Sequence, residues 1–116
     1  MRMAFLVAGL LAVASPTLAA DPVGSYRVEG RNPGDGDAYS GTVQVSRTGG
    51  TYRVVWLVAG QQFVGTGIGD AEFMAISYTS GGSTGLALFG ARGGNWDGAW
   101  TYAGGRALGG ERWIRQ

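Results

Sequence analysis

Residues 42–58 read TVQVSRTGGTYRVVWLV, two alternating runs separated by a pair of glycines. Val43 and Val45 alternate with polar residues before the glycines, and Tyr52 and Trp56 continue the alternation after them. A period of two places apolar side chains on one face of a strand and polar side chains on the other. Two such runs around a glycine turn predict an antiparallel β-hairpin with one buried face.

The pattern continues on both sides of this hairpin and predicts eight strands. Their expected ranges are 25–29, 39–47, 51–58, 62–68, 72–79, 84–91, 95–102 and 107–115. Short glycine-rich connections join them, and no helical period of useful length follows residue 20. Short turns favour pairing between successive strands, so we predict an all-β fold: a single closed antiparallel up-and-down barrel of about eight strands.

A weak internal repeat is compatible with this barrel. Sliding the chain by 44 residues places Tyr52 on Trp96 and Trp56 on Trp100, together with matching glycine pairs. Aligned aromatics carry more information here than aligned glycines, because the chain has 23 glycines among 116 residues. The repeat predicts two units of four strands, with Trp56 and Trp100 at equivalent buried positions.

Residues 1–20 have the pattern of a cleaved secretory signal peptide. Arg2 precedes an apolar run at 4–14, and small residues lead to Ala20. The run is too short to span a bilayer, and the chain has no cysteine to carry the acyl group of a lipoprotein. We therefore expect residues 21–116 to form a single domain in a periplasmic or secreted protein, with no membrane span after cleavage.

The residue inventory excludes much of enzyme chemistry. The chain has no histidine and no cysteine, which removes Ser-His-Asp and Cys-His nucleophiles, the usual zinc sites and thiol redox chemistry. A net charge of +1 argues against a nucleic-acid partner. The remaining carboxylates lie at predicted turns or on outward strand positions, with the exception of Glu111. We therefore expect a protein that is not an enzyme and uses no cofactor.

The loop 31–37 offers a possible metal site, because Asp35 and Asp37 have the spacing with which calcium loops begin. The distant bidentate glutamate of an EF-hand is missing. Asn, Pro, Gly and Asp are also the residues that an ordinary turn requires for backbone reasons. We expect a turn and no metal.

The candidate ligand-binding residues are aromatic, with one arginine. They are Tyr26, Tyr52, Trp56, Trp96, Trp100 and Arg112. Such rings fill a small barrel by default, and they form a binding site only where several are exposed together. Arg112 has two readings as well. It is expected to close the barrel by stacking on Tyr26, with Glu111 near solvent on the opposite face, or else to supply a ligand-binding charge.

Gly24-x-Tyr26 in the first strand and Glu111-Arg112-Trp113 in the last resemble the lipocalin and avidin barrels. That resemblance implies a calycin-like barrel whose last-strand arginine packs across the closed end. Over nearly the whole of residues 21–116, the chain resembles small exported bacterial proteins labelled fibronectin-binding. The likeness is carried by Gly24-x-Tyr26-x-Val28-x-Gly30-x-Asn32-Pro33, Tyr39-x-Gly41-x-Val43, Tyr52-x-Val54-x-Trp56, Gly65-Thr66-Gly67-Ile68, Gly98-x-Trp100 and Gly110-Glu111-Arg112-Trp113.

These observations favour a non-enzymatic extracytoplasmic binding module that recognises a host or envelope macromolecule, and the second resemblance implies a fibronectin-like partner. Two alternatives stay open: a lipocalin- or avidin-like carrier of a small apolar ligand, and an envelope structural protein or hydrolase inhibitor. A cavity open at one end of the barrel would favour the carrier. An exposed apolar patch on the outer surface would favour a protein partner.

Overall fold

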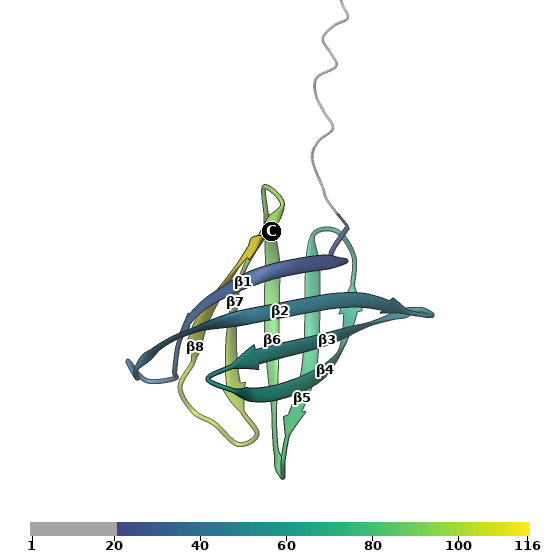
Figure 1. The fold of residues 1–116 in the computed structure, drawn as a ribbon. Helices are drawn as coiled ribbons and strands as arrows, with labels where there is room; N and C mark the ends of the chain where they lie inside the picture. Colours follow the sequence, from purple (N-terminus) through teal and green to yellow (C-terminus); the bar gives the residue numbers. More distant parts are fainter. Residues whose placement is uncertain (1–20) are drawn as a thin grey trace, which may run out of the picture.

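The computed structural model describes residues 21–116, so the predicted signal peptide lies outside the described residues. The described chain forms eight strands (Figure 1): β1 (Gly24–Arg31), β2 (Ala38–Thr48), β3 (Thr51–Val58), β4 (Gln61–Gly69), β5 (Phe73–Ser80), β6 (Ser83–Arg92), β7 (Asn95–Tyr102) and β8 (Gly109–Arg115). Each strand pairs antiparallel with the next, and β8 pairs with β1 to close the barrel. The predicted fold class is confirmed.

Two strands have the predicted bounds, and they are the strands that the internal repeat aligned. β3 runs over Thr51–Val58 and β7 over Asn95–Tyr102, so each begins and ends 44 residues from the other. Tyr52 and Trp96 are both buried in the core. Trp56 and Trp100 both face the interior, but Trp56 is buried and Trp100 only partly buried, so the predicted equal burial of this pair is wrong. The two halves therefore present the same strand face to the inside of the barrel.

One end of the barrel is filled by its own side chains. Tyr26 packs on Trp113 with ring centroids 5.4 Å apart, and Phe89 packs on the same indole at 4.2 Å. Aliphatic and aromatic residues from neighbouring strands complete this core, and each of the following is at most 3% exposed: Val28, Val43, Val45, Tyr52, Val54, Met74, Ile76 and Trp96. A core of this density holds the barrel without disulfides.

Strand glycines make room for large side chains on the inner wall. A Cβ at Gly85 would lie 2.3 Å from the ring of Tyr78, and a Cβ at Gly109 would lie 2.8 Å from the indole of Trp100. Other inward strand positions held by glycine are Gly30, Gly41, Gly65, Gly67 and Gly98. The glycine content thus reflects the packing of rings inside a narrow barrel as well as the turns.

Arg115, and not Arg112, closes the filled end. Its guanidinium donates hydrogen bonds to the carbonyl oxygens of Asp21, Val23 and Gly94 at 2.8, 3.1 and 3.0 Å. Its Cζ lies 4.8 Å from the ring centroid of Tyr26. The planar cation therefore ties the residues before β1 to the β6–β7 turn and stacks on a first-strand aromatic.

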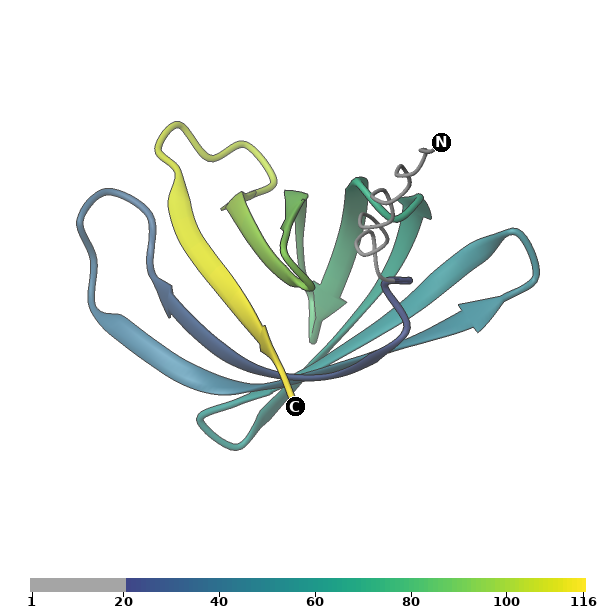
Figure 2. The same ribbon diagram turned by 90° about the horizontal axis from the view of Figure 1, so that it is seen from above.

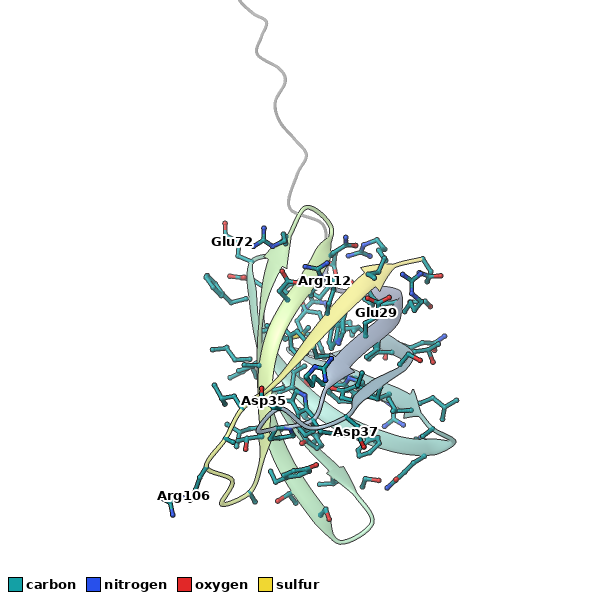
Figure 3. All side chains as sticks on the ribbon, turned by 90° about the vertical axis from the view of Figure 1, so that its left-hand side faces the viewer. Glu29, Asp35, Asp37, Glu72, Arg106 and Arg112 are labelled. Carbon is teal, nitrogen blue, oxygen red and sulfur yellow. The ribbon has the colours of Figure 1, made fainter. Side chains whose placement is uncertain are left out.

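The expected position of Arg112 is wrong, as is that of Glu111. Arg112 lies on the outer surface beside Glu29, its partner in the register of β1 and β8 (Figure 3), and donates to Asp97 at 3.0 Å. Side chains alternate along β8, so Glu111 shares the inner face with Trp113 and Arg115. The predicted alternation of side chains along β8 is therefore shifted by one residue, which exchanges the two faces of the strand.

The two ends of the barrel differ in their connections. Residues 21–23, which precede β1, and the C-terminus lie at the filled end, while the β5–β6 turn and the β7–β8 loop lie at the other (Figure 1). At that second end the β1–β2 and β7–β8 loops lie side by side (Figure 2), and the amide of Gly34 donates to the carbonyl of Leu108. Residues 21–116 contain no helix long and apolar enough to cross a membrane.

Candidate functional site

The end of the barrel opposite Arg115 contains an open cavity of about 310 Å³. This volume is at the lower limit of small-molecule sites in proteins. Side chains from seven strands and two connections line it: Asn32, Tyr39, Trp56, Val58, Ala59, Gln61, Phe63, Tyr78, Ala87, Trp100, Tyr102 and Glu111. The barrel is therefore filled at one end and hollow at the other.

Glu111 lies on the inner wall of the cavity and accepts three hydrogen bonds. The indole Nε1 atoms of Trp56 and Trp113 both donate to its Oε2 at 2.7 Å. The hydroxyl of Tyr39 donates a short hydrogen bond to Oε1. These donors come from β2, β3 and β8, so the site exists only when the barrel has closed. No arginine is paired with this carboxylate among the described residues.

The protonation behaviour of the site follows from this burial. Desolvation raises the pKa of Glu111, and the hydrogen bonds from Tyr39, Trp113 and Trp56 oppose that rise. Desolvation and the neighbouring carboxylate of Glu111 also raise the pKa of Tyr39 far above its ordinary value. Burial raises the pKa of Tyr78 to about 12. Both tyrosines are therefore neutral donors at physiological pH, and Glu111 is the one carboxylic acid among the residues that line the cavity.

Five aromatic residues of the lining pack on one another, and we call them the aromatic box: Tyr39, Trp56, Phe63, Tyr78 and Trp100. Trp100 meets Tyr39 and Tyr78 edge-on, with ring centroids 6.1 and 6.3 Å apart and interplanar angles of 72° and 69°. Tyr78 also meets Trp56 at 62° and Phe63 at 73°. These edge-to-face contacts pack the rings against one another, and the same five residues line the cavity. The Nε1 atom of Trp100 is buried without a hydrogen-bond partner in the described chain.

The six predicted binding residues fall into three groups. Trp56 and Trp100 line the cavity. Tyr26, Tyr52 and Trp96 are at most 2% exposed and lie in the filled core, away from the cavity lining. Arg112 lies on the outer surface.

Sequence reasoning missed four important lining residues: Tyr39, Phe63, Tyr78 and Glu111. A signal for three of them is present in the strand alternation. Tyr39 shares its face with Val43 and Val45, and Tyr78 shares its face with Met74 and Ile76. Glu111 is two residues from Trp113, whose size favours the inside of a barrel. The short hydrogen bond between Tyr39 and Glu111 joins residues 72 apart, which no local pattern reveals.

The loop between β1 and β2 has the contacts of a turn. The amide of Asn32 donates to the carbonyl of Asp37, and the amide of Gly36 donates to the carbonyl of Asn32. Asp35 adopts a left-handed backbone with φ 62°. Within residues 21–116 no group of three or more His, Cys, Asp or Glu side chains gathers in a way that could hold a metal ion.

The outer surface carries an apolar face over β4, β5 and β6. Ile68, Phe73, Leu86 and Leu88 are each between 58% and 63% exposed. Cross-strand pairing joins Ile68 to Ala75 and Ala75 to Leu88, so the apolar residues form a continuous row. Between Arg53 and Arg92 the only charged residues are Asp70 and Glu72. We call this surface the β4–β6 face.

The barrel thus has a cavity at one end, lined by aromatic residues and one carboxylate, and a core of buried side chains at the other. The resemblances noted from the sequence stay predictions. No protein family model matches the chain, and no curated protein sequence is detectably similar to it.

Proposed function

We propose that this protein binds a small molecule in the open end of its barrel, in the manner of a non-enzymatic carrier or scavenger. The single observation that carries the proposal is the 310 Å³ cavity, lined by aromatic residues from opposite sides of the barrel. Of the alternatives that the sequence left open, this is the small-ligand carrier. The expected location is outside the cytoplasm, as the pattern of residues 1–20 predicts.

Packing supports the proposal, because a barrel of eight strands is narrow enough to be filled by its own side chains. At the Arg115 end it is filled, with Trp96, Trp113 and Phe89 at most 1% exposed. At the open end, glycine stands at Gly85 and Gly109, next to the rings of Tyr78 and Trp100. The sequence thus brings large rings to the wall of the cavity without filling its centre.

A neutral naphthylamine dye provides a direct test, since its fluorescence rises in an apolar site. We expect saturable binding of the dye to the wild-type barrel at one site. Ala87→Leu adds bulk to the cavity wall, where Ala87 is 6% exposed, and should abolish that binding. Leu88→Ala changes the next residue, which points outward, and should leave binding intact. If Ala87→Leu bound the dye as wild type does, the cavity would not be the binding site.

A second candidate function is recognition of a protein partner, which the sequence favoured first. The observation behind it is the β4–β6 face, whose exposed apolar residues are continuous across strands. Contiguous apolar surface of this kind is typical of interaction sites. Pull-down from envelope extracts tests it: Leu88→Arg should lose a partner that Ala87→Leu retains.

A further inference from the structure

We propose that the cavity selects a small organic cation, an ammonium ion with an apolar body. The inference rests on the proposed function, and it names the chemical class of the ligand. Two features of the cavity carry it. The carboxylate of Glu111 lacks a cationic partner, and aromatic residues line the cavity together with it.

The charge balance of the cavity is the first argument. Glu111 is the only charged residue in the lining, and no arginine is among those residues. An ionised carboxylate removed from water is costly unless opposite charge or hydrogen bonds compensate it. Three donors supply hydrogen bonds, but the indole and phenol groups are neutral and leave the negative charge in place. A cation in the cavity would complete the compensation.

The hydrogen-bond capacity of the carboxylate points the same way. Its two oxygens offer about four acceptor positions, and three are used. Oε2 accepts from both indoles, while Oε1 accepts from Tyr39 alone. Oε1 therefore retains an acceptor position for the N–H group of a protonated amine, whereas a quaternary ammonium ion would interact with Glu111 through its charge alone. Glu111 itself is only partly buried.

The aromatic box is the second argument. Ring faces carry negative electrostatic potential, and cages of tyrosine and tryptophan bind ammonium groups through it. Here Trp56, Tyr78 and Trp100 stand at 62° and 69° to one another in succession. An anionic ligand would meet both the ring faces and Glu111 unfavourably. A neutral ligand would leave the charge of Glu111 without a partner.

Three probes of similar size, two charged and one neutral, provide the test. The probes are choline, protonated dimethylaminoethanol, and the neutral isostere of choline in which carbon replaces the quaternary nitrogen. Their binding to the barrel is measured by isothermal titration and by tryptophan fluorescence, because Trp56 and Trp100 line the cavity. We expect the cations to bind more tightly than the neutral isostere.

Glu111→Gln removes the charge while keeping the shape. The amide oxygen can accept from Trp56 and Trp113, and the amide nitrogen can donate to the Tyr39 oxygen. We expect cation binding to weaken by about tenfold or more, the scale of one desolvated charge contact, and binding of the neutral dye to change by a much smaller factor. Glu29→Gln makes the same change on the outer surface and should leave both affinities unchanged. Should Glu111→Gln fail to fold, Trp100→Leu provides a second test, because loss of the ring should weaken cation binding by a much larger factor than dye binding.

The outcomes separate the two proposals. Equal or tighter binding of the neutral isostere, or full cation binding by Glu111→Gln, would overturn the ligand class and leave the cavity function standing. If the dye binds in the cavity and neither cation does, the ligand class is likewise wrong and the cavity function stands. If neither the dye nor any probe binds the wild-type protein, both proposals are wrong.

Discussion

Arg115 joins the last strand of the barrel to the residues that precede the first strand. It contacts three carbonyl oxygens and the face of Tyr26, whereas Arg112 makes one exposed ion pair with Asp97. Lysine keeps the charge but has neither the planar face nor the forked donors of arginine. The contribution of each arginine to stability therefore depends on how many of its donors form hydrogen bonds and on whether its planar face stacks on a ring.

Arg115→Lys should lower the free energy of unfolding by about 1–3 kcal/mol, since it loses charge-assisted hydrogen bonds and a stacked cation. Arg112→Lys should change it by less than about 1 kcal/mol, as is usual for exposed ion pairs. Equilibrium denaturation of both variants measures the difference. A larger loss for Arg112→Lys would contradict the assignment of the closing residue.

Glu111 should make stability depend on pH in a characteristic direction. Burial raises its pKa in the folded state, so the folded protein holds this proton more tightly than the unfolded chain. That contribution to stability is complete below the ordinary carboxyl pKa and is lost as pH rises through the folded pKa. In Glu111→Gln it should be absent, so the difference in unfolding free energy between wild type and variant should fall as pH rises.

Denaturation of both proteins over a pH series checks this prediction. Subtracting the unfolding free energy of the variant from that of the wild type cancels the pH dependence that other titratable groups contribute to both. Asp97 is one such group: burial raises its pKa, but hydrogen bonds from Arg112 and Arg92 outweigh that effect and lower it. Its stabilising contribution is lost as pH falls through its lowered folded pKa, which is the opposite direction. Parallel pH curves for wild type and Glu111→Gln would show that burial does not perturb Glu111.

At the scale of the element, the strands were predictable and one strand face was not. β3 and β7 match their predicted bounds because apolar alternation and glycine turns are both local signals. In β8 each face carries charge, with Glu111 and Arg115 on one side and Arg112 on the other. The general preference of charged residues for water therefore places Glu111 on the outer face of β8, whereas the structure has it on the inner face. Two of the three donors that stabilise Glu111 inside the barrel come from β2 and β3, which are distant in sequence.

The inner glycines of β8 and its neighbours provide a prediction about packing. A Cβ at Gly109 would lie 2.5 Å from the backbone oxygen of Arg31 and 2.8 Å from the indole of Trp100. Backbone cannot move aside cheaply, so Gly109→Ala should destabilise the barrel by about 1–3 kcal/mol. Gly110→Ala is the matched control, because its Cβ would meet nothing within 4 Å. Similar unfolding midpoints for the two variants would argue against close packing at this wall.

At the scale of the whole molecule, the barrel divides stability and binding between its ends. The Arg115 end contains the most buried rings, including Trp96 and Trp113 at no more than 1% exposed. The open end contains rings that are packed on one side and face the cavity on the other. Both kinds of aromatic residue were visible in the sequence. Their division depends on the strand register and on where the barrel is closed, which local patterns do not determine.

Trp96 and Trp100 lie on the same inner face of β7, one in the filled core and the other in the cavity lining. The two residues therefore allow the filled end and the open end to be compared within one strand. Trp96 is 1% exposed, so Trp96→Ala should lose about 3–5 kcal/mol of stability, as for other large core deletions. Trp100 faces the cavity and its Nε1 has no hydrogen-bond partner in the described chain, so Trp100→Ala should lose less. Equilibrium denaturation gives both values, and dye titration of the same proteins gives the binding. We expect Trp100→Ala to weaken dye binding, because the side chain that it removes lines the cavity, and to lose less unfolding free energy than Trp96→Ala. An equal loss of stability in the two variants would mean that Trp100 is a core residue, and that the open end is packed as part of a single continuous core.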